Sequence, residues 1–394
     1  MESAPVIVSC GAVTALGQGL EPLEGALRDN TSGLRAVNRF AGKRHQSSVA
    51  GCVPEGVLDD LRAAHPGHAD APAFLLAESA LRQAEQGAGD WLEALPPARR
   101  GLVLSTTKAD VAALERQVAG HSCSAPARRH VLAGLLAADL AEARELRGPV
   151  QCVSVACVSG LLALQQGAQW IQRGLADAVF VVGVDLVTDF VMAGFTTLKS
   201  LDPEGCRPFD RARTGLSLGE GAGAVLLTRP ALVPSGRLSL AGWGSSNDAN
   251  HLTGPSRDGS GLALAIGRAL EMAATAPAAI DYVNAHGTGT LYNDAMEALA
   301  LRSVFGAAVP PFSASKGLLG HTLGAAGVLE TIVCAIAATR GLLPGTPRLR
   351  ERDPAVPAAV LVEPRAGAVP RRMLKINAGF GGTNAALVLA RKEP

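Results

Sequence analysis

Short apolar runs alternate with helix-like segments along this chain, and this alternation restricts the possible fold more than any other feature. The strand-like runs, many of them bounded by Gly or Ser, are Pro5–Ser9, Gly101–Ser105, Val150–Val155, Ala178–Val184, Ala222–Thr228, Arg237–Gly242, Ile280–Ala285, Pro311–Ser315, Ala358–Glu363, Met373–Asn377 and Ala385–Ala390. The helix-like segments between them include Ala71–Glu85, Gly160–Arg173, Leu262–Ala274, Asp294–Phe305 and Ala325–Arg340. Strands that alternate with helices predict an α/β fold with layered sheets. The runs around Val181 and Leu226 are apolar nearly throughout, which is typical of a sheet covered on both faces.

The length and an internal similarity indicate a duplicated chain. The sequence has 394 residues, more than one ordinary hydrophobic core accommodates. Val150–Arg173 and Pro311–Arg340 share one construction, in which a strand leads through a turn into a helix that opens with small residues. The turn Arg229–Gly236 is the natural seam between the two parts. We therefore predict two halves, residues 1–235 and 236–394.

The composition argues against several classes of protein. The formal net charge is +1, so the bulk charge predicts neither a nucleic-acid partner nor a membrane partner, although a local basic patch could bind an acidic one. The 7 cysteines form no Cys-X-X-Cys pair, which argues against a disulfide framework and a zinc ribbon. The N-terminus lacks the pattern of a signal peptide, and no apolar stretch of about 18 residues appears. We expect a soluble, cytoplasmic protein without a bound metal or redox cofactor.

Cys157 stands between a strand-like run that ends at Ala156 and a helix that begins directly after it. This context predicts a sharp turn with the sulfur at a helix N-terminus, where unpaired N–H groups and the helix dipole lower the pKa of a thiol. The same N–H groups could stabilise an oxyanion, and the small residues Ser159 and Gly160 leave room for a substrate. For a lone cysteine, a buried structural role stays open as the alternative.

Two segments offer histidines. His286 follows the predicted strand Ile280–Ala285 and precedes Thr288 and Thr290, whereas His321 follows Lys316 on a polar turn. If the two imidazoles lie close together, both can donate N–H bonds to one developing enolate oxygen. Taken alone, the first segment fits a satisfied core histidine equally well, and the second fits a surface lysine with a capping histidine.

Glycines surround Phe380 in the segment Asn377–Asn384. Gly379 and Gly381 predict a close approach of the backbone to a ligand or to another loop, and a tight hairpin turn is the alternative. Glu220 lies among glycines at the entry to a buried strand, so it needs a partner. We interpret the Glu220 segment as structural support for the site.

Together these segments resemble the beta-ketoacyl synthases of the thiolase-like condensing-enzyme superfamily, over nearly the whole chain and in the family's order. The matching segments are Ser9–Gly17, Ala156–Gly160, Arg207–Asp210, Gly219–Gly223, Gly242–Pro255, His286–Thr290 with Asn293, Asp294 and Glu297, Lys316–His321, and Gly379–Asn384. The fold that this resemblance implies is a duplicated α-β-α-β-α five-layer sandwich, usually a dimer.

The resemblance also implies a reaction, decarboxylative Claisen condensation. Cys157 would accept an acyl chain from the phosphopantetheine of an acyl carrier protein, with the backbone N–H groups of Cys157 and Phe380 as the oxyanion hole. His286 and His321 would stabilise the malonyl enolate. Lys316 would organise the charge around His321, through Glu330 or a water.

Further roles follow from the same resemblance. Phe380 would gate the acyl pocket. The residues implied to line the malonyl or phosphopantetheine path are Thr288, Thr290, Gly379 and Gly381, and the implied supporting residues are Glu220, Glu330 and Asn384.

Some segments depart from the commonest pattern of the family. They are Ser9–Gly11, Ser105–Lys108, Val158 after the nucleophile, and Thr214 where an aspartate is common. These departures resemble specialised synthases that build polyene or aryl-polyene chains, so the acyl substrate stays open.

Rival interpretations share the fold. A chain-length-factor subunit keeps the fold but loses the cysteine, whereas this chain has Cys157, His286, Lys316 and His321. It could still be the catalytic half of such a heterodimer. A thiolase uses a second cysteine near the C-terminus, and Ala378–Asn384 has none. A binding-only module would need none of these groups.

Overall fold

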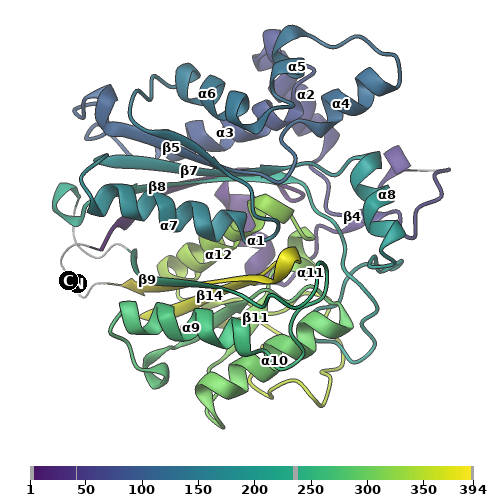
Figure 1. Cartoon of the computed structure of the whole chain (residues 1–394), viewed down its shortest axis with the longest axis vertical. Coiled ribbons are helices and arrows are strands. Elements are labelled where there is room, and N and C mark those ends of the chain that lie inside the picture. Colours follow the sequence, from purple (N-terminus) through teal and green to yellow (C-terminus); the bar gives the residue numbers. More distant parts are fainter. Residues whose placement is uncertain (1–3, 41, 234–237, 392–394) are drawn as a thin grey trace.

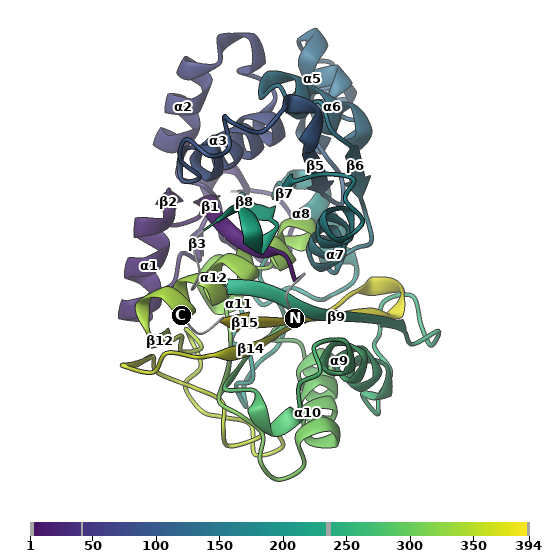
Figure 2. The ribbon, with the colours of Figure 1, turned by 90° about the vertical axis from the view of Figure 1, so that its left-hand side faces the viewer.

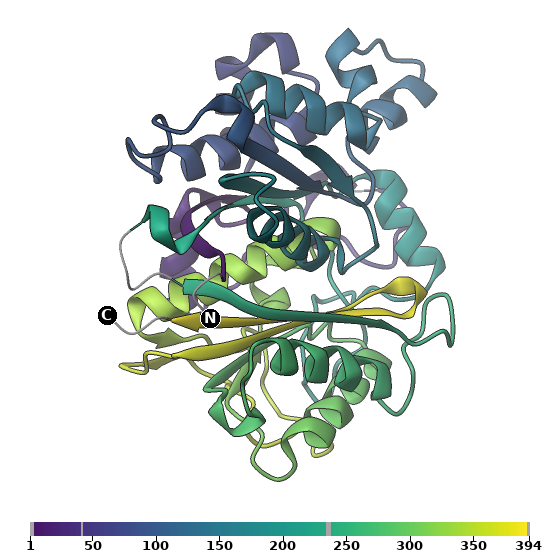
Figure 3. The same cartoon turned by 60° about the vertical axis from the view of Figure 1, so that its left-hand side comes forward.

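The computed structural model describes residues 4–40, 42–233 and 238–391, and it is built from five layers (Figure 1). From one outer side to the other, these are helices α3 and α6, a first sheet, helices α7 and α12, a second sheet, and helices α9 and α10; Figures 2 and 3 show the same order from other sides. The helix bounds are α3 Pro72–Gln86, α6 Ala133–Ala143, α7 Ser159–Gln172, α9 Ser260–Met272, α10 Leu291–Phe305 and α12 Ala326–Arg340. The predicted five-layer α/β sandwich is confirmed.

The two sheets have the same topology. Their strand orders are β6-β5-β7-β8-β1 and β11-β10-β14-β15-β9, and in each the first two pairs are parallel and the last two antiparallel. The strand bounds are β1 Val6–Thr14, β5 Arg100–Ser105, β6 Val150–Val153, β7 Ala178–Asp185, β8 Gly221–Thr228, β9 Leu238–Asn247, β10 Tyr282–Ala285, β11 Phe312–Ala314, β14 Arg372–Ala378 and β15 Thr383–Arg391. The first strand of each set lies at one end and the third at the other, so one half repeats the topology of the other.

The sheets meet where β1 pairs with β9, at Val6 and Ser239. The predicted boundary between residues 235 and 236 lies outside the described residues, so the division into halves 1–235 and 236–394 stays a prediction.

Alternate residues of the central strands point into different layers. In β7, Val179 and Val181 pack in the cluster that contains α7 and α12, whereas Phe180 and Val182 pack in the cluster that contains α3. All eight residues of β7 are buried. The prediction of a sheet covered on both faces is therefore confirmed.

The two middle helices touch through glycine. A Cβ atom added at Gly160 of α7 would lie 2.7 Å from the backbone N of Val328 in α12 and 2.8 Å from the Cα of Gly327. Because no side chain separates the backbones there, the N-terminal ends of α7 and α12 come together in the middle layer.

Some elements differ from the predictions. Ala358–Glu363 forms no strand in the described part of the chain and contributes only the isolated bridge between Val360 and Phe312.

The remaining elements are β2 Gly17–Gln18, α1 Leu20–Asp29, β3 Arg35–Ala36, β4 Val49–Ala50, α2 Glu55–Ala64, α4 Val111–Val118, α5 Ala125–Arg129, α8 Asp189–Thr197, α11 Lys316–Leu319, β12 Leu342–Leu343 and β13 Arg365–Ala366, with short 3-10 turns between them.

One segment is long and apolar enough to cross a membrane by length and composition. This segment, Leu323–Arg340, contains α12 and is 83% buried inside the protein. The core helix of a soluble protein passes the same test, and α12 occupies such a position in the middle layer (Figure 2).

Candidate active site

Cys157 lies in a sharp connection between β6, which ends at Val153, and α7, which begins at Ser159. Ala156 has φ = 44°, in the left-handed region that residues with a side chain rarely adopt. The Ser159 hydroxyl braces this turn, since it accepts the Val155 N–H at 2.8 Å and donates to the Ala156 carbonyl at 2.7 Å. The predicted turn is present, with backbone strain at the residue before the nucleophile.

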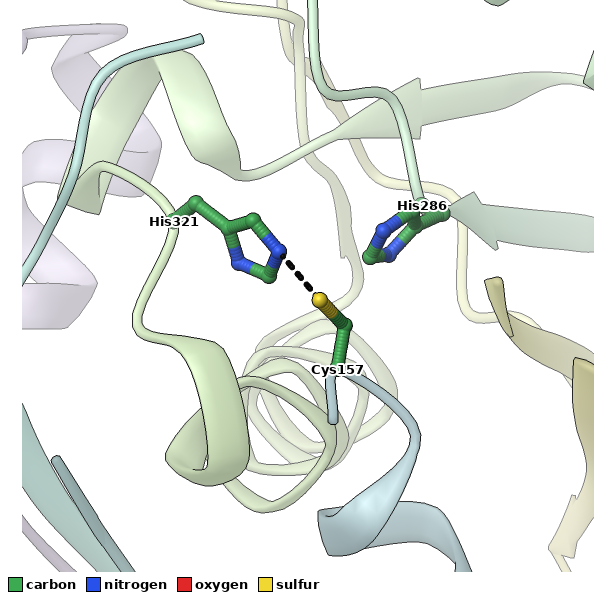
Figure 4. A group of neighbouring side chains, drawn as sticks. All are labelled: Cys157, His286 and His321. Carbon is green, nitrogen blue, oxygen red and sulfur yellow. Dashed lines mark hydrogen bonds between the residues drawn. The ribbon is translucent and has the colours of Figure 1, made fainter. Parts of the chain in front are cut away.

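The Cys157 sulfur lies 3.0 Å from Nε2 of His321 (Figure 4). Burial raises the pKa of the Cys157 thiol to about 11, and the charge of Lys316 and a hydrogen bond from the Phe380 backbone N–H oppose this only in part. The expected lowering of the thiol pKa is therefore wrong. Loss of hydration outweighs the helix N-terminus because the sulfur is buried.

His321 follows α11 and is fixed in one tautomer. The Leu323 N–H donates to its Nδ1 at 3.2 Å. A neutral imidazole that accepts at Nδ1 carries its hydrogen on Nε2, so this N–H points at Cys157. Burial, followed by the charge of Lys316, lowers the pKa of His321 well below its usual value, and the ring stays neutral.

His286 follows β10, as predicted, and Glu297 holds its turn. The two carboxylate oxygens of Glu297 accept the backbone N–H groups of His286 and Gly287, each at 2.6 Å. The Lys316 ammonium donates to Nδ1 of His286 at 3.1 Å, so the hydrogen of the neutral ring lies on Nε2. Burial, followed by the charge of Lys316, also lowers the pKa of His286 well below its usual value.

The two imidazoles and the sulfur meet at one point. The ring centroids of His286 and His321 are 5.2 Å apart, and the planes are nearly perpendicular at 84°. One nitrogen of each ring and the Cys157 sulfur lie within 4.8 Å of one another, and both rings face the sulfur (Figure 4). The structure thus brings together the predicted nucleophile and two N–H donors.

Lys316 is buried and uses all its N–H bonds. Besides Nδ1 of His286, its Nζ contacts the His286 carbonyl and Glu330 Oε1, both at 2.6 Å. Its direct contacts are therefore with His286 and with Glu330. Lys316 acts on His321 through its charge, which helps to lower the pKa of that ring. Although burial opposes ionisation, Lys316 and Lys375 hold the pKa of Glu330 below its usual value.

Two residues of this network, Lys375 and Asn377 in β14, were not predicted from the sequence. Lys375 Nζ lies 2.9 Å from Glu330 Oε2. Asn377 Nδ2 lies 3.0 Å from the same oxygen and 2.9 Å from Nδ1 of His286. Polar residues two apart in an apolar strand share one face, and a buried charge needs a partner. The pattern Lys-Ile-Asn at 375–377 could therefore have predicted a buried polar network on one face of this strand.

A cavity of about 440 Å³ opens above the sulfur and the two rings. Thr288 and Thr290 line it, with their hydroxyls 2.9 Å apart. Phe380 lines it as well, and its ring centroid lies 6.0 Å from that of Phe195. Further lining residues include Leu198, Lys199, Leu216, His251, Thr253, Leu291 and Tyr292.

The glycine loop after β14 forms one wall of this cavity. A Cβ atom added at Gly379 would lie 3.2 Å from the backbone N of Cys157, so the predicted close approach is to the nucleophile turn. Gly381 has φ = 81°, which favours glycine. Asn384 Nδ2 donates to Asp248 Oδ1 at 2.7 Å and ties the loop to a neighbouring segment.

Glu220 has the partner that its burial requires. Its carboxylate lies 2.5 Å from Arg39 Nη2 and accepts the backbone N–H groups of Val53 and Val187 at 3.1 and 3.0 Å. Glu220 is not among the described residues that line the cavity.

Cys157, His286 and His321 also form a potential metal-binding donor set. A metal ion in the cavity would need the Nε2 lone pair of each ring. Nδ1 accepts hydrogen bonds in both rings, so each Nε2 carries hydrogen instead. The donor set therefore does not fit a metal ion in this arrangement.

Comparison with known proteins agrees with the geometry. The model described as "Beta-ketoacyl synthase, N-terminal domain" matches residues 4–231, and the model of the corresponding C-terminal domain matches residues 238–350. This chain belongs to the beta-ketoacyl synthase family. The synthase is 32% identical to the "Actinorhodin polyketide putative beta-ketoacyl synthase 1" of Streptomyces coelicolor, over 98% of this chain and 88% of the relative. It is 30% identical to the mitochondrial "3-oxoacyl-[acyl-carrier-protein] synthase" of Arabidopsis thaliana, over 98% of this chain and 92% of the relative.

Solved structures resemble the synthase over its whole length. "The ishigamide ketosynthase/chain length factor" superposes with a TM-score of 0.88 at 31% identity and covers 100% of both chains. One chain of the structure titled "Ketosynthase (ApeO) in Complex with its Chain Length Factor (ApeC) from Xenorhabdus doucetiae" superposes with a TM-score of 0.84 at 29% identity, over 99% of this chain and 98% of that chain.

Proposed function

We propose that this beta-ketoacyl synthase is a 3-oxoacyl-[acyl-carrier-protein] synthase, an acyltransferase that extends an acyl chain held on Cys157 by decarboxylative condensation with a malonyl thioester. The observation that carries the proposal is the group at the base of the cavity, where the Cys157 sulfur lies 3.0 Å from Nε2 of His321 and within 4.8 Å of a ring nitrogen of His286. A relative that is 30% identical bears the same reaction in its name.

The first half-reaction loads Cys157. Its sulfur attacks the carbonyl carbon of an acyl thioester, the bond to the pantetheine sulfur breaks, and that sulfur takes the thiol proton. The backbone N–H groups of Cys157 and Phe380 form the oxyanion hole for the tetrahedral intermediate. The close approach of Gly379 to the Cys157 backbone supports this pairing.

The second half-reaction extends the chain. The malonyl thioester loses carbon dioxide, and the electron pair of the broken bond forms an enolate. The Nε2–H groups of His286 and His321 bind the enolate oxygen. The enolate carbon then attacks the acyl group on Cys157, and the sulfur leaves as a thiolate. This thiolate takes a proton from the solvent, because the pKa of the Cys157 thiol is about 11. Both rings are neutral at physiological pH, because burial lowers the pKa of each.

Lys316 and Glu330 fix the donors for this step. Lys316 donates its N–H bonds to His286 and to Glu330, so it acts as a positioning group behind the imidazole of His286. Thr288 and Thr290, with Gly379 and Gly381, line the path of the malonyl or phosphopantetheine group, and Phe380 gates the acyl pocket.

The partner that these steps require is an acyl carrier protein, whose phosphopantetheine arm delivers both thioesters. The enzyme holds no cofactor of its own in this proposal. It works in the cytoplasm as a dimer. Each chain has two halves, residues 1–235 and 236–394.

A second candidate concerns the dimer. The two solved structures described above are titled as complexes of a ketosynthase with a chain length factor, which favours a heterodimer. Because this chain has Cys157 beside His321, it would be the catalytic subunit. For such a heterodimer, we propose a polyene-type acyl chain as the substrate.

Intact-protein mass spectrometry tests the proposal. The protein is incubated with acyl carrier proteins loaded with acetyl, medium-chain or polyenoyl groups, beside a Cys157→Ala control. Acylation of the wild type alone is expected, and the preferred group identifies the substrate class. Equal labelling of Cys157→Ala would contradict the assigned nucleophile. Labelling that requires an added ketosynthase-like subunit would select the heterodimer.

A further inference from the structure

Asn377 and Lys375 are buried beside the catalytic centre, and no step above uses them. Both lie in β14, where every second residue points to the same face. Met373, on that face, packs in the middle-layer cluster, whereas Leu374 packs in the outer cluster. Lys375 and Asn377 therefore point into the middle layer, toward Glu330 of α12.

Glu330 fixes the orientation of the Asn377 amide. The Asn377 Nδ2 lies 3.0 Å from Glu330 Oε2 and 2.9 Å from Nδ1 of His286. A carboxylate that two lysines hold in its ionised form can only accept, so the amide nitrogen faces it. The two amide hydrogens then go to Glu330 and His286. Asn377 Oδ1 has no hydrogen-bond partner among the described residues.

Lys375 connects this carboxylate to the strand that carries His286. Its Nζ lies 2.9 Å from Glu330 Oε2 and donates to the carbonyl oxygens of Asn284 and Ala285 at 3.3 and 3.2 Å. These two carbonyls belong to the last residues of β10, directly before His286. One ammonium group therefore holds both the carboxylate that orients Asn377 and the end of the strand.

We propose that Asn377, held by Glu330 and Lys375, is a positioning residue that keeps Nδ1 of His286 an acceptor and its Nε2–H directed into the cavity. This inference rests on the proposed function of the same site. Lys316 reaches the same nitrogen at 3.1 Å but shares its ammonium with two other acceptors, whereas the planar amide offers a fixed donor at 2.9 Å. In the opposite tautomer, a lone pair on Nε2 would face the enolate oxygen and repel it.

The test measures the tautomer and the two half-reactions separately. The wild type, Asn377→Leu and Asn377→Asp are labelled with ¹⁵N-histidine, and NMR shows which His286 nitrogen carries hydrogen, with His286→Gln to assign the signal. Asn377→Asp keeps the volume of the side chain if Asn377→Leu fails to fold. The matched control is Asn284→Leu, a buried asparagine of β10 that bonds Tyr282 and Ser315. Carbon dioxide release from malonyl-pantetheine and acylation by acetyl-pantetheine are timed on the same samples.

We expect Nε2–H in the wild type and in Asn284→Leu, and a shift toward Nδ1–H in both Asn377 variants. Carbon dioxide release should fall at least about 10-fold in those variants, since removing a donor outright costs on the order of 100-fold or more. Acylation of Cys157 should stay within about threefold, because the oxyanion hole is untouched.

An unchanged tautomer with carbon dioxide release near the wild-type rate would overturn the proposal, because Lys316 alone would then suffice. A parallel fall in acylation would also overturn it by showing a structural role. If the wild type itself neither releases carbon dioxide nor becomes acylated, the proposed function fails, and the NMR result still decides the claim about Asn377.

Discussion

The connection from β6 to α7 and the connection from β11 to α12 occupy equivalent places in the two halves, yet they contribute different chemistry. The first runs from Val153 to Ser159 and carries an uncharged nucleophile on a strained turn. The second runs from Ala314 to Ala326 and inserts α11, so it has room for a lysine and a histidine. The two halves thus share one topology. The short connection from β6 to α7 carries the nucleophile, and the longer connection from β11 to α12 carries groups that stabilise the enolate.

The two connections meet because the helices that follow them touch. Gly160 and Gly327 let the ends of α7 and α12 come into backbone contact, and the sulfur and the His321 ring lie beside this contact. The buried lysines and the glutamate of the network all come from the second half. Substitutions in that charge network, at the glycine contact and at the neutral histidines test the difference between the two connections.

The largest effect is expected from the charge network. Glu330→Gln keeps the side-chain volume but leaves the ammonium groups of Lys316 and Lys375 without a carboxylate. The free energy of unfolding, measured by urea titration, should fall by about 3–5 kcal/mol. The control is Glu351→Gln, whose partner Arg211 is 65% exposed, and its change should stay within about 1 kcal/mol. Similar losses in both variants would contradict the claim that the buried charge network contributes more to stability than an exposed ion pair.

A smaller effect is expected at the helix contact. Gly160→Ala places a methyl group within 3 Å of the α12 backbone, so the helices must separate. We expect a loss of about 1–3 kcal/mol in the free energy of unfolding, with slower acylation of Cys157. Gly194→Ala in α8 is the matched control, since an added Cβ there meets no atom within 4 Å, and it should stabilise the helix by up to about 1 kcal/mol. Equal stability of the two variants would contradict the backbone contact.

Much of this site could be predicted from the sequence, because turns, glycines and motif order are local. Cys157, His286 and His321 were found in this way, and the structure brings them together. The depth of burial is not local, and for this reason the direction of the thiol pKa shift was predicted wrongly. The contact of Lys316 with His286 depends on the register of β10 against β11 and β14, which no single segment contains. Ala358–Glu363 has the apolar pattern of a strand but lacks a place in the sheet.

The last effect concerns stability in acid and is absent near neutral pH. Burial lowers the pKa of His286 and His321, so the unfolded chain binds protons below about pH 6.5 that the folded chain does not. The free energy of unfolding should therefore be maintained above pH 6.5 and fall below it, by up to about 1.4 kcal/mol per pH unit for each ring. Replacing both histidines with glutamine should flatten this slope, whereas His121→Gln, at an exposed position, should not. If the double replacement leaves the slope unchanged, groups other than His286 and His321 take up the protons on unfolding.

We propose that Cys157 on one connection and the two histidines, His286 and His321, act together in a single condensation. This joint action can be followed in a single turnover. The acylated protein is isolated and mixed with ¹³C-labelled malonyl carrier protein, and intact-protein mass spectrometry and the release of labelled carbon dioxide are recorded. We expect the acyl mass to leave Cys157 as carbon dioxide appears, and the carrier to hold a chain two carbons longer. Chain extension while Cys157 keeps its acyl group would contradict it.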